Sequence, residues 1–212
     1  MNIDFVSDVS CPWCAIGLMS LDIALARIGE PLQIELHLQP FELNPHLPTE
    51  GQEINEHLTQ KYGSSPEELA RTRETIRERG EAVGFVFGKD KRQRVYNTFD
   101  AHRLLHWAGL IDGHQKALKL ALLKAYFTDG EDPSNHAVLV RIAGDVGLDT
   151  ARARDILASN AYADEVRALE QRFQELGIRS VPSVIIDNKH LIQGGQPPEA
   201  FERAIRKIAG LT

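Results

Sequence analysis

The stretch of sequence that decides the fold is Val9-Ser10-Cys11-Pro12-Trp13-Cys14, which holds the only two cysteines of the 212-residue chain. Residues 3–9 are largely apolar and predict a short strand that leads into this stretch. Residues 16–28 are rich in Ile, Leu and Met and predict a helix that follows it. The two thiols are therefore close enough to form a disulfide across one turn of chain.

The position of the two cysteines predicts different chemistry for each. As the N-cap of the helix, Cys11 would face the free N–H groups of the first turn and the positive end of the helix dipole. Both favour the thiolate, so the pKa of Cys11 should fall below the ordinary value of about 8.5. Pro12 would occupy the first helical position, where its missing N–H costs nothing. Cys14 would be more buried and higher in pKa, as suits a resolving thiol. A Cys-x-x-Cys pair between a strand and a helix is typical of a thioredoxin-like redox site.

A zinc site is an alternative interpretation of the cysteine pair. A closed zinc site needs four ligands, and the sequence has no second cysteine pair. None of the eight histidines forms an H-x-x-x-H pair beside the cysteines. His102 and His106 have the i, i+4 spacing of a metal-binding face, but they fall in a predicted amphipathic helix over residues 98–109, where ordinary surface or core histidines are commoner. We therefore predict redox chemistry and no metal.

Composition agrees with an enzyme that works in solution. The net charge is -6, and both signs are interspersed along the chain, which argues against nucleic acid as a partner. No segment approaches the ~18 apolar residues of a membrane span. Residues 1–4 show no basic region and no cleavable apolar stretch, so we expect no secretory signal and a cytoplasmic location. A structural disulfide would be reduced there, so a Cys-x-x-Cys pair is expected to cycle between its two redox states.

The C-terminal part predicts a hairpin and a helix. Residues 183–187 form an apolar strand, Asn188 and Lys189 a turn, and residues 190–195 a second strand. Pro198 begins a helix with an apolar face. Pro182 stands directly before the first strand, where a proline can adopt the cis form. The alternative interpretation is that Pro182 merely starts an edge strand.

The chain resembles the DsbA family of thioredoxin-like proteins, and within it the cytoplasmic FrnE-like branch of dithiol–disulfide oxidoreductases or isomerases. The segments that carry the resemblance follow one another in the expected order: Ser10-Cys11-Pro12-Trp13-Cys14, Pro40-Phe41-Glu42-Leu43-Asn44-Pro45, Tyr96-Asn97-Thr98-Phe99-Asp100-Ala101-His102-Arg103, Gly177-Ile178-Arg179-Ser180-Val181-Pro182 and Gly194-Gly195-Gln196. The fold class implied is α/β, a thioredoxin-like mixed sheet flanked by helices with a large all-helical insertion.

The resemblance also implies roles for individual residues. Cys11 is the attacking thiol, Cys14 the resolving thiol, and Pro182 a cis-proline that faces the sulfurs. The backbone of Val181 would pair with an extended substrate peptide, which is recognition by strand addition. The substrate-binding set implied by family position is Pro12, Trp13, Phe41, Asn44, Val181 and Pro182. Protein disulfides are the implied substrates, without a cofactor. Glutathione or a thioredoxin-type protein is a candidate reductant, and a homodimer a candidate assembly.

A long helical insertion is expected between the two thioredoxin-like parts. We predict the N-terminal part over residues 1–47, the insertion over 48–160, and the C-terminal part over 161–212. Ser65-Pro66-Glu67-Glu68 predicts a capping box, and three other residues are suitable N-caps, namely Asp112, Ser134 and Asp149. The basic run over residues 89–94 is interpreted as a solvated loop.

Two other classes of function remain open at this point. The kappa-class glutathione transferases and the 2-hydroxychromene-2-carboxylate isomerases belong to the same superfamily and bind glutathione in the same cleft. These enzymes place a serine where this chain has Cys11. The presence of Cys14 also argues against a transferase function, because a transferase has no use for a resolving thiol. A redox-inactive docking module is the third class, and the intact cysteine pair argues against it.

Overall fold

The computed structural model describes residues 1–29, 32–48, 50–111 and 113–211. A four-stranded sheet lies at its centre, in the order β2-β1-β5-β6. Its strands are β1 (Asn2–Ser7), β2 (Glu35–Pro40), β5 (Ser183–Ile186) and β6 (His190–Gln193). β1 and β2 are parallel, whereas β5 is antiparallel to β1 and to β6. Residues from the two ends of the chain therefore pair at the centre of one mixed sheet.

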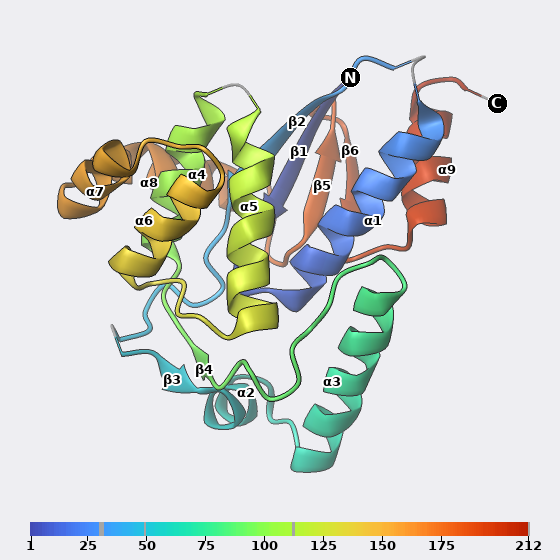
Figure 1. Ribbon diagram of the computed structural model, residues 1–212. Helices are drawn as coiled ribbons and strands as arrows, with labels where there is room; N and C mark the ends of the chain where they lie inside the picture. Colours follow the sequence, from blue (N-terminus) through green and yellow to red (C-terminus); the bar gives the residue numbers. More distant parts are fainter. Residues whose placement is uncertain (30–31, 49, 112, 212) are drawn as a thin grey trace.

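Helices cover this sheet on both sides (Figure 1). Helix α1 packs against α9 on one side, and α4 and α8 contact β2. The helical segments are α1 (Pro12–Ile28), α2 (Ile54–Tyr62), α3 (Pro66–Glu81), α4 (Phe99–Gly109), α5 (His114–Lys124), the π-helical turn η1 (Ala125–Asp129), α6 (His136–Asp145), α7 (Thr150–Ala158), α8 (Ala163–Glu175) and α9 (Pro198–Ile208). A short antiparallel pair, β3 (Gln52–Glu53) and β4 (Arg94–Val95), lies apart from the main sheet.

The apolar core joins the insertion to the sheet. One buried cluster combines Phe5 of β1 and Leu18 of α1 with Phe85, Leu123 and Tyr126 of the insertion. A second cluster fills the space among α4, α5, α6 and α7, and includes Val9 from the β1–α1 loop. Burial of apolar surface stabilises both clusters. Because residues of the insertion pack with α1 in the first cluster and with Val9 in the second, the insertion holds the β1–α1 loop in place. The division of the chain at residues 47 and 160 stays a prediction.

Most local signals in the sequence act as expected. Ser65 and Glu68 form the predicted capping box, and Asp149 caps α7. The prediction for Ser134 is wrong by one residue, because the side chain of Asn135 accepts the N–H groups of Ala137 and Val138. Asp112 lies outside the described residues. The apolar pattern predicts a strand over residues 3–9. The observed strand β1 begins one residue earlier and ends two residues earlier than predicted.

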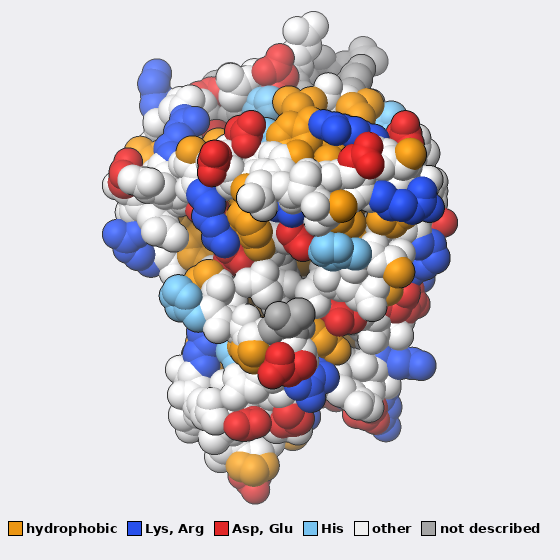
Figure 2. All heavy atoms as spheres, turned by 90° about the vertical axis from the view of Figure 1, so that its left-hand side faces the viewer, with side chains coloured by type: hydrophobic (Ala, Val, Ile, Leu, Met, Phe, Trp, Pro, Cys, Tyr) orange, Lys and Arg blue, Asp and Glu red, His pale blue; other side chains and the backbone are white. Residues whose placement is uncertain are grey.

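The surface carries both signs of charge. Figure 2 shows the face at the left of Figure 1, where basic and acidic side chains alternate across the molecule. Such a distribution produces no large field of a single sign on this face. Within the described part of the chain, no helix combines the length and the apolar character needed to cross a membrane.

Candidate active site

The two cysteines lie at the junction of β1 and α1. Cys11 is the N-cap of α1 with extended backbone angles (φ -97°, ψ 115°), and Pro12 follows at the first helical position. The N–H of Cys14 donates to the carbonyl oxygen of Cys11 at 3.1 Å, so the first turn brings both thiols to the same end of the helix. Both cysteines are free thiols, and Cys11 is 4% exposed whereas Cys14 is fully buried. This is the order of burial that the sequence predicts.

The loop before β5 faces Cys11 from across the site. The Sγ atom of Cys11 donates to the carbonyl oxygen of Val181 at 3.7 Å, and the Val181–Pro182 peptide bond is cis. Pro182 also lies against α1, since a Cβ atom on Gly17 would come within 3.1 Å of its Cγ atom. Glycine at position 17 therefore lets this loop approach the helix closely. Segments separated by 170 residues meet at the sulfur.

The two thiols ionise in opposite directions. The hydrogen bond from the Cys14 thiol lowers the pKa of Cys11, and backbone N–H groups of Cys14 and Trp13 lower it further, against burial and the charge of Asp8. Burial raises the pKa of Cys14 well above its ordinary value, and the neighbouring Cys11 raises it further. Cys11 therefore loses its proton more readily than Cys14, which makes Cys11 the better nucleophile of the two.

We expect alkylation to separate the two thiols by pH. The thiolate is the reactive form, and its fraction grows as the pH rises through the pKa. In the reduced protein, the labelling rate of Cys11 by iodoacetamide should reach its plateau at a lower pH than an ordinary thiol, with a midpoint below about 8.5. Cys14 should label much more slowly throughout. Mass spectrometry of tryptic peptides, sampled over time at several pH values, measures both rates. Equal rates for both thiols would contradict the assigned roles.

A buried carboxylate, Asp8, organises the loop in front of Cys11. Its Oδ1 atom accepts from the backbone N–H of Ser10 at 3.1 Å, and its Oδ2 atom accepts from the Ser10 hydroxyl at 2.9 Å and from the Leu43 N–H at 2.7 Å. His102 Nε2 lies 3.5 Å from Oδ1. Although burial raises the pKa of Asp8, His102 and the two backbone N–H groups outweigh it and hold the pKa well below its usual range. Asp8 is therefore an ionised structural anchor.

A second polar cluster joins the helical insertion to the loop after β2. Arg167 of α8 contacts the carboxylates of Glu42 and Glu170, the latter at 2.7 Å. Asn97 donates to Glu42 at 3.0 Å. Burial raises the pKa of Glu170, with His102 and Arg167 opposing. Residues 40–45 and 96–103, two of the segments on which the family resemblance rests, thus meet in this cluster. Their contacts hold the loop that contains Leu43 in place.

Cationic side chains surround the mouth of the site. Lys61, at the end of α2, donates to the Leu43 carbonyl at 2.8 Å and to the Asn44 side chain at 2.7 Å. Burial lowers the pKa of Lys61, and the negative charges of Asp8 and Cys11 raise it. Arg92 donates to the Ser10 carbonyl at 3.2 Å and to the Tyr126 hydroxyl at 2.7 Å. The solvated-loop interpretation of residues 89–94 is wrong for Arg92, which is half-buried against the active-site loop.

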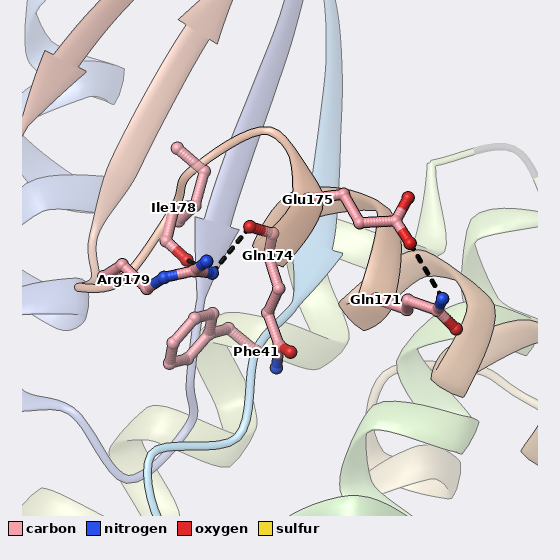
Figure 3. A pocket seen from close by; sticks show the side chains of 6 residues that line it. All are labelled: Phe41, Gln171, Gln174, Glu175, Ile178 and Arg179. Carbon is pink, nitrogen blue, oxygen red and sulfur yellow. Dashed lines mark hydrogen bonds between the residues drawn. The ribbon is translucent and has the colours of Figure 1, made fainter.

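The other predicted substrate-binding residues lie in two places. Trp13 is half-buried and packs on the core that contains Phe5. Phe41 belongs instead to a small apolar cluster with Val181 and Ile178. Phe41 lines a surface pocket together with Ile178 and polar side chains of α8 (Figure 3). The pocket has a volume of about 440 Å³, and Arg179 at its edge donates to the Gln174 carbonyl at 2.6 Å. Phe41 and Val181 are therefore neighbours, whereas Trp13 packs in a separate cluster.

No metal centre accompanies the thiols in the described ranges. Among those residues, no group of three or more His, Cys, Asp or Glu side chains could hold a metal ion. His102 is 2% exposed and lies beside Asp8, so it is a core histidine.

Comparison with known proteins places the chain in a family. A model of the DSBA-like thioredoxin domain matches residues 2–206. The chain belongs to the DSBA-like thioredoxin family. Its structure is similar to that of a probable DsbA oxidoreductase, SCO1869 of Streptomyces coelicolor, with a TM-score of 0.92 and 34% identity over 99% of this chain and 90% of the other. The predicted family and the predicted fold class, a thioredoxin-like sheet with a helical insertion, are confirmed.

Other relatives of this DSBA-like chain are more distant in sequence. The Bacillus subtilis protein YwbO is 26% identical over 97% of this chain and 96% of its own length. The cytosolic disulfide reductase DsbM of Pseudomonas aeruginosa, solved with GSH, aligns over 100% of both chains with a TM-score of 0.70 and 17% identity. A 2-hydroxychromene-2-carboxylate isomerase aligns with a TM-score of 0.69 and 14% identity, also over 100% of both chains. Identities this low indicate a shared fold only.

Sequence reasoning missed four charged residues of the site, namely Asp8, Lys61, Arg92 and Lys119. Lys119 had a signal, because it lies in the Leu- and Ala-rich run over residues 118–127. A lysine on the apolar face of such a helix is rarely buried unless it is paired. Asp8 had no comparable signal, since two of its three partners, Leu43 and His102, come from segments far along the chain.

Proposed function

We propose that this DSBA-like oxidoreductase exchanges disulfides of protein substrates through the Cys11–Cys14 dithiol, as a reductase or isomerase in the cytoplasm. The observation that carries the proposal is the position of Cys11, a low-pKa thiol at a helix N-terminus that faces the Val181 carbonyl. A substrate strand that pairs with the backbone at Val181 would present its disulfide to this sulfur. The cytosolic setting of the structural relative DsbM agrees with a dithiol that is kept reduced.

The chemistry runs in two exchanges. The Cys11 thiolate attacks one sulfur of the substrate disulfide, and the other sulfur leaves with the electron pair of the broken bond. Cys14 then loses its proton and attacks the Cys11 sulfur, which forms the Cys11–Cys14 disulfide and releases the second substrate thiolate. Two electrons pass from the dithiol to the substrate. The proton lost by Cys14 and one proton from water convert the two released thiolates into thiols.

Two assays test this proposal. We expect the protein to accelerate both the reduction of insulin by dithiothreitol and the refolding of scrambled ribonuclease. Activity in the insulin assay alone would identify a reductase. Activity in the ribonuclease assay as well would show that the protein is also an isomerase. A fully reduced and folded protein that accelerates neither reaction would contradict a protein substrate.

A second candidate, an anionic low-molecular-weight disulfide such as glutathione disulfide, is favoured by the cationic mouth. Lys61 donates to the carbonyl of Leu43 and Arg92 to the carbonyl of Ser10, so both contact the loops that border Cys11. Carboxylates of a small substrate could pair with these side chains, since charge-assisted hydrogen bonds are stronger than neutral ones. Lys61 lies close enough to Cys11 for the charge of Cys11 to raise its pKa. A preference for anionic over uncharged disulfides would therefore distinguish this candidate from thiol exchange without charge recognition.

We expect Lys61→Met to lower kcat/KM for glutathione disulfide by about tenfold, the equivalent of one lost charge-assisted contact. The rate with the uncharged 2-hydroxyethyl disulfide should change by less than about twofold, because that substrate offers no carboxylate to Lys61. Lys89→Met removes an exposed lysine of a loop and serves as the control. An equal loss with both disulfides would contradict recognition of the charge.

A further inference from the structure

A lysine is buried directly behind the dithiol. Lys119 of α5 is 1% exposed, and among the described residues its one hydrogen bond runs from Nζ to the carbonyl oxygen of Ser7, at 3.5 Å. One turn earlier on the same helix, Lys116 reaches the surface and pairs with Asp22 of α1 at 3.1 Å. Burial of an ammonium group is costly unless a negative charge compensates it. The surroundings of Lys119 must therefore supply that charge.

Asp8 is committed to other donors. Its two oxygens already accept two hydrogen bonds from Ser10 and one from Leu43, and His102 lies within 3.5 Å. The hydrogen bonds of Asp8 therefore stabilise the loop in front of Cys11. Asp8 attracts Lys119 only by its charge, without a hydrogen bond between the two side chains. A second negative charge arises behind the loop only when Cys14 ionises.

One peptide group connects Lys119 to Cys14. The carbonyl oxygen of Ser7 accepts from Lys119, and the N–H of the same Ser7–Asp8 peptide interacts with the Cys14 sulfur, which lowers the pKa of this thiol. An ammonium group that polarises a carbonyl oxygen strengthens the N–H donor of the same peptide, since hydrogen bonds in a chain reinforce one another. The arrangement therefore favours the Cys14 thiolate over the thiol.

We propose that Lys119 is a positioning residue for the resolving step, in which it stabilises the Cys14 thiolate through the Ser7–Asp8 peptide. The inference rests on the proposed dithiol exchange and assigns part of it to the helical insertion. While Cys14 is a thiol, Asp8 and Cys11 supply the negative charge that compensates the buried ammonium, and the contribution of Cys11 is lost once its sulfur forms the mixed disulfide. When Cys14 ionises to attack the mixed disulfide on Cys11, the two charges compensate each other in a medium of low dielectric constant.

The ionisation of Lys119 itself agrees with this role. Burial lowers the pKa of Lys119, while the negative charges of Cys14, then of Asp8 and Cys11, raise it. The effect is reciprocal, because the charge of Lys119 lowers the pKa of Cys14. The titratable groups that face Lys119 thus come from the β1–α1 loop and from α1, and Cys14 acts on it most strongly.

A single-turnover reaction with a chromogenic aromatic disulfide tests the proposal. The attack of Cys11 releases one coloured thiolate, and the attack of Cys14 on the resulting mixed disulfide releases the second, so the two phases report on the two cysteines separately. In Lys119→Met we expect the first phase to change by less than about threefold, and the second to slow about tenfold near neutral pH with its pH midpoint raised by about one unit.

The controls separate this role from a structural one. Lys116→Met removes the charge of the neighbouring exposed lysine and should leave both phases unchanged. Lys119→Gln gives a second neutral variant if Lys119→Met does not fold, and circular dichroism verifies the fold of each. An unchanged second phase, or equal slowing of both phases, would overturn the proposal. A wild-type protein that never releases the second thiolate would instead refute the proposed dithiol exchange.

Discussion

We expect Cys11→Ser to lower the reduction of insulin disulfides to the rate of dithiothreitol alone. The serine hydroxyl stays protonated at neutral pH and cannot form a disulfide, so no mixed intermediate arises. Cys11 is the thiol whose pKa is lowered and whose sulfur contacts the Val181 carbonyl. The turbidity assay for insulin measures the loss. Residual acceleration in the Cys11→Ser protein would show that another group starts the exchange.

Cys14→Ser is the matched variant and should fail at a different step. Its Cys11 still attacks, but no resolving thiol remains one helical turn away. The protein should therefore accumulate a mixed disulfide with its substrate, visible as a covalent adduct in non-reducing gels and absent after reduction. The Cys11→Ser protein should form no such adduct under the same conditions.

We expect Arg103→Met to lower the free energy of unfolding by about 3–5 kcal/mol, as for other buried charges that lose their partner. Arg103 is buried, with 4% of its surface exposed. It donates to the carbonyl of Ala161 at 2.9 Å and to Asp100 at 2.7 Å, and also contacts the carbonyls of Ile156 and Ser159 at the end of α7. Its removal takes a donor from the carbonyl groups of Ala161, Ile156 and Ser159 and leaves Asp100 with His136 as its ionic partner.

Chemical denaturation followed by circular dichroism measures this loss. Arg154→Met, on the exposed face of α7, is the control and should change the unfolding free energy by less than about 0.5 kcal/mol. An equally small change in the unfolding free energy for Arg103→Met would mean that water replaces Arg103 as the hydrogen-bond donor to these carbonyl groups. The fold of the helical insertion would then depend less on Arg103 than its contacts indicate.

Local signals predicted the parts of the fold that depend on neighbouring residues. The Cys-Pro-x-Cys turn, the capping box at Ser65 and the turn at Asn188 and Lys189 each rest on a few adjacent side chains, and each appears where the sequence places it. The cap of α6 was misplaced because Ser134 and Asn135 are both good cap residues. Asp132 accepts from the N–H and hydroxyl of Ser134, which leaves Asn135 to cap the helix.

The charged surroundings of the thiols could not be predicted in the same way. Two partners of Asp8, Leu43 and His102, come from the loop after β2 and from α4, and the lysine behind Cys14 comes from α5. These segments meet only once the insertion has packed on the sheet. The sequence therefore identifies the reactive pair, while the groups that adjust its ionisation depend on tertiary structure. The roles of Trp13 and Asn44 toward a substrate stay predictions.

The central claim, that Cys11 and Cys14 form one redox couple, is tested most directly by equilibration with glutathione. The wild-type protein is incubated in mixtures of reduced and oxidised glutathione, quenched with an alkylating reagent and analysed by mass spectrometry. We predict that both thiols become protected together as one intramolecular disulfide, with a reduction potential between those of thioredoxin at about −270 mV and DsbA at about −120 mV. Two alkylated thiols at every ratio, or a stable glutathione adduct in place of the disulfide, would contradict the account.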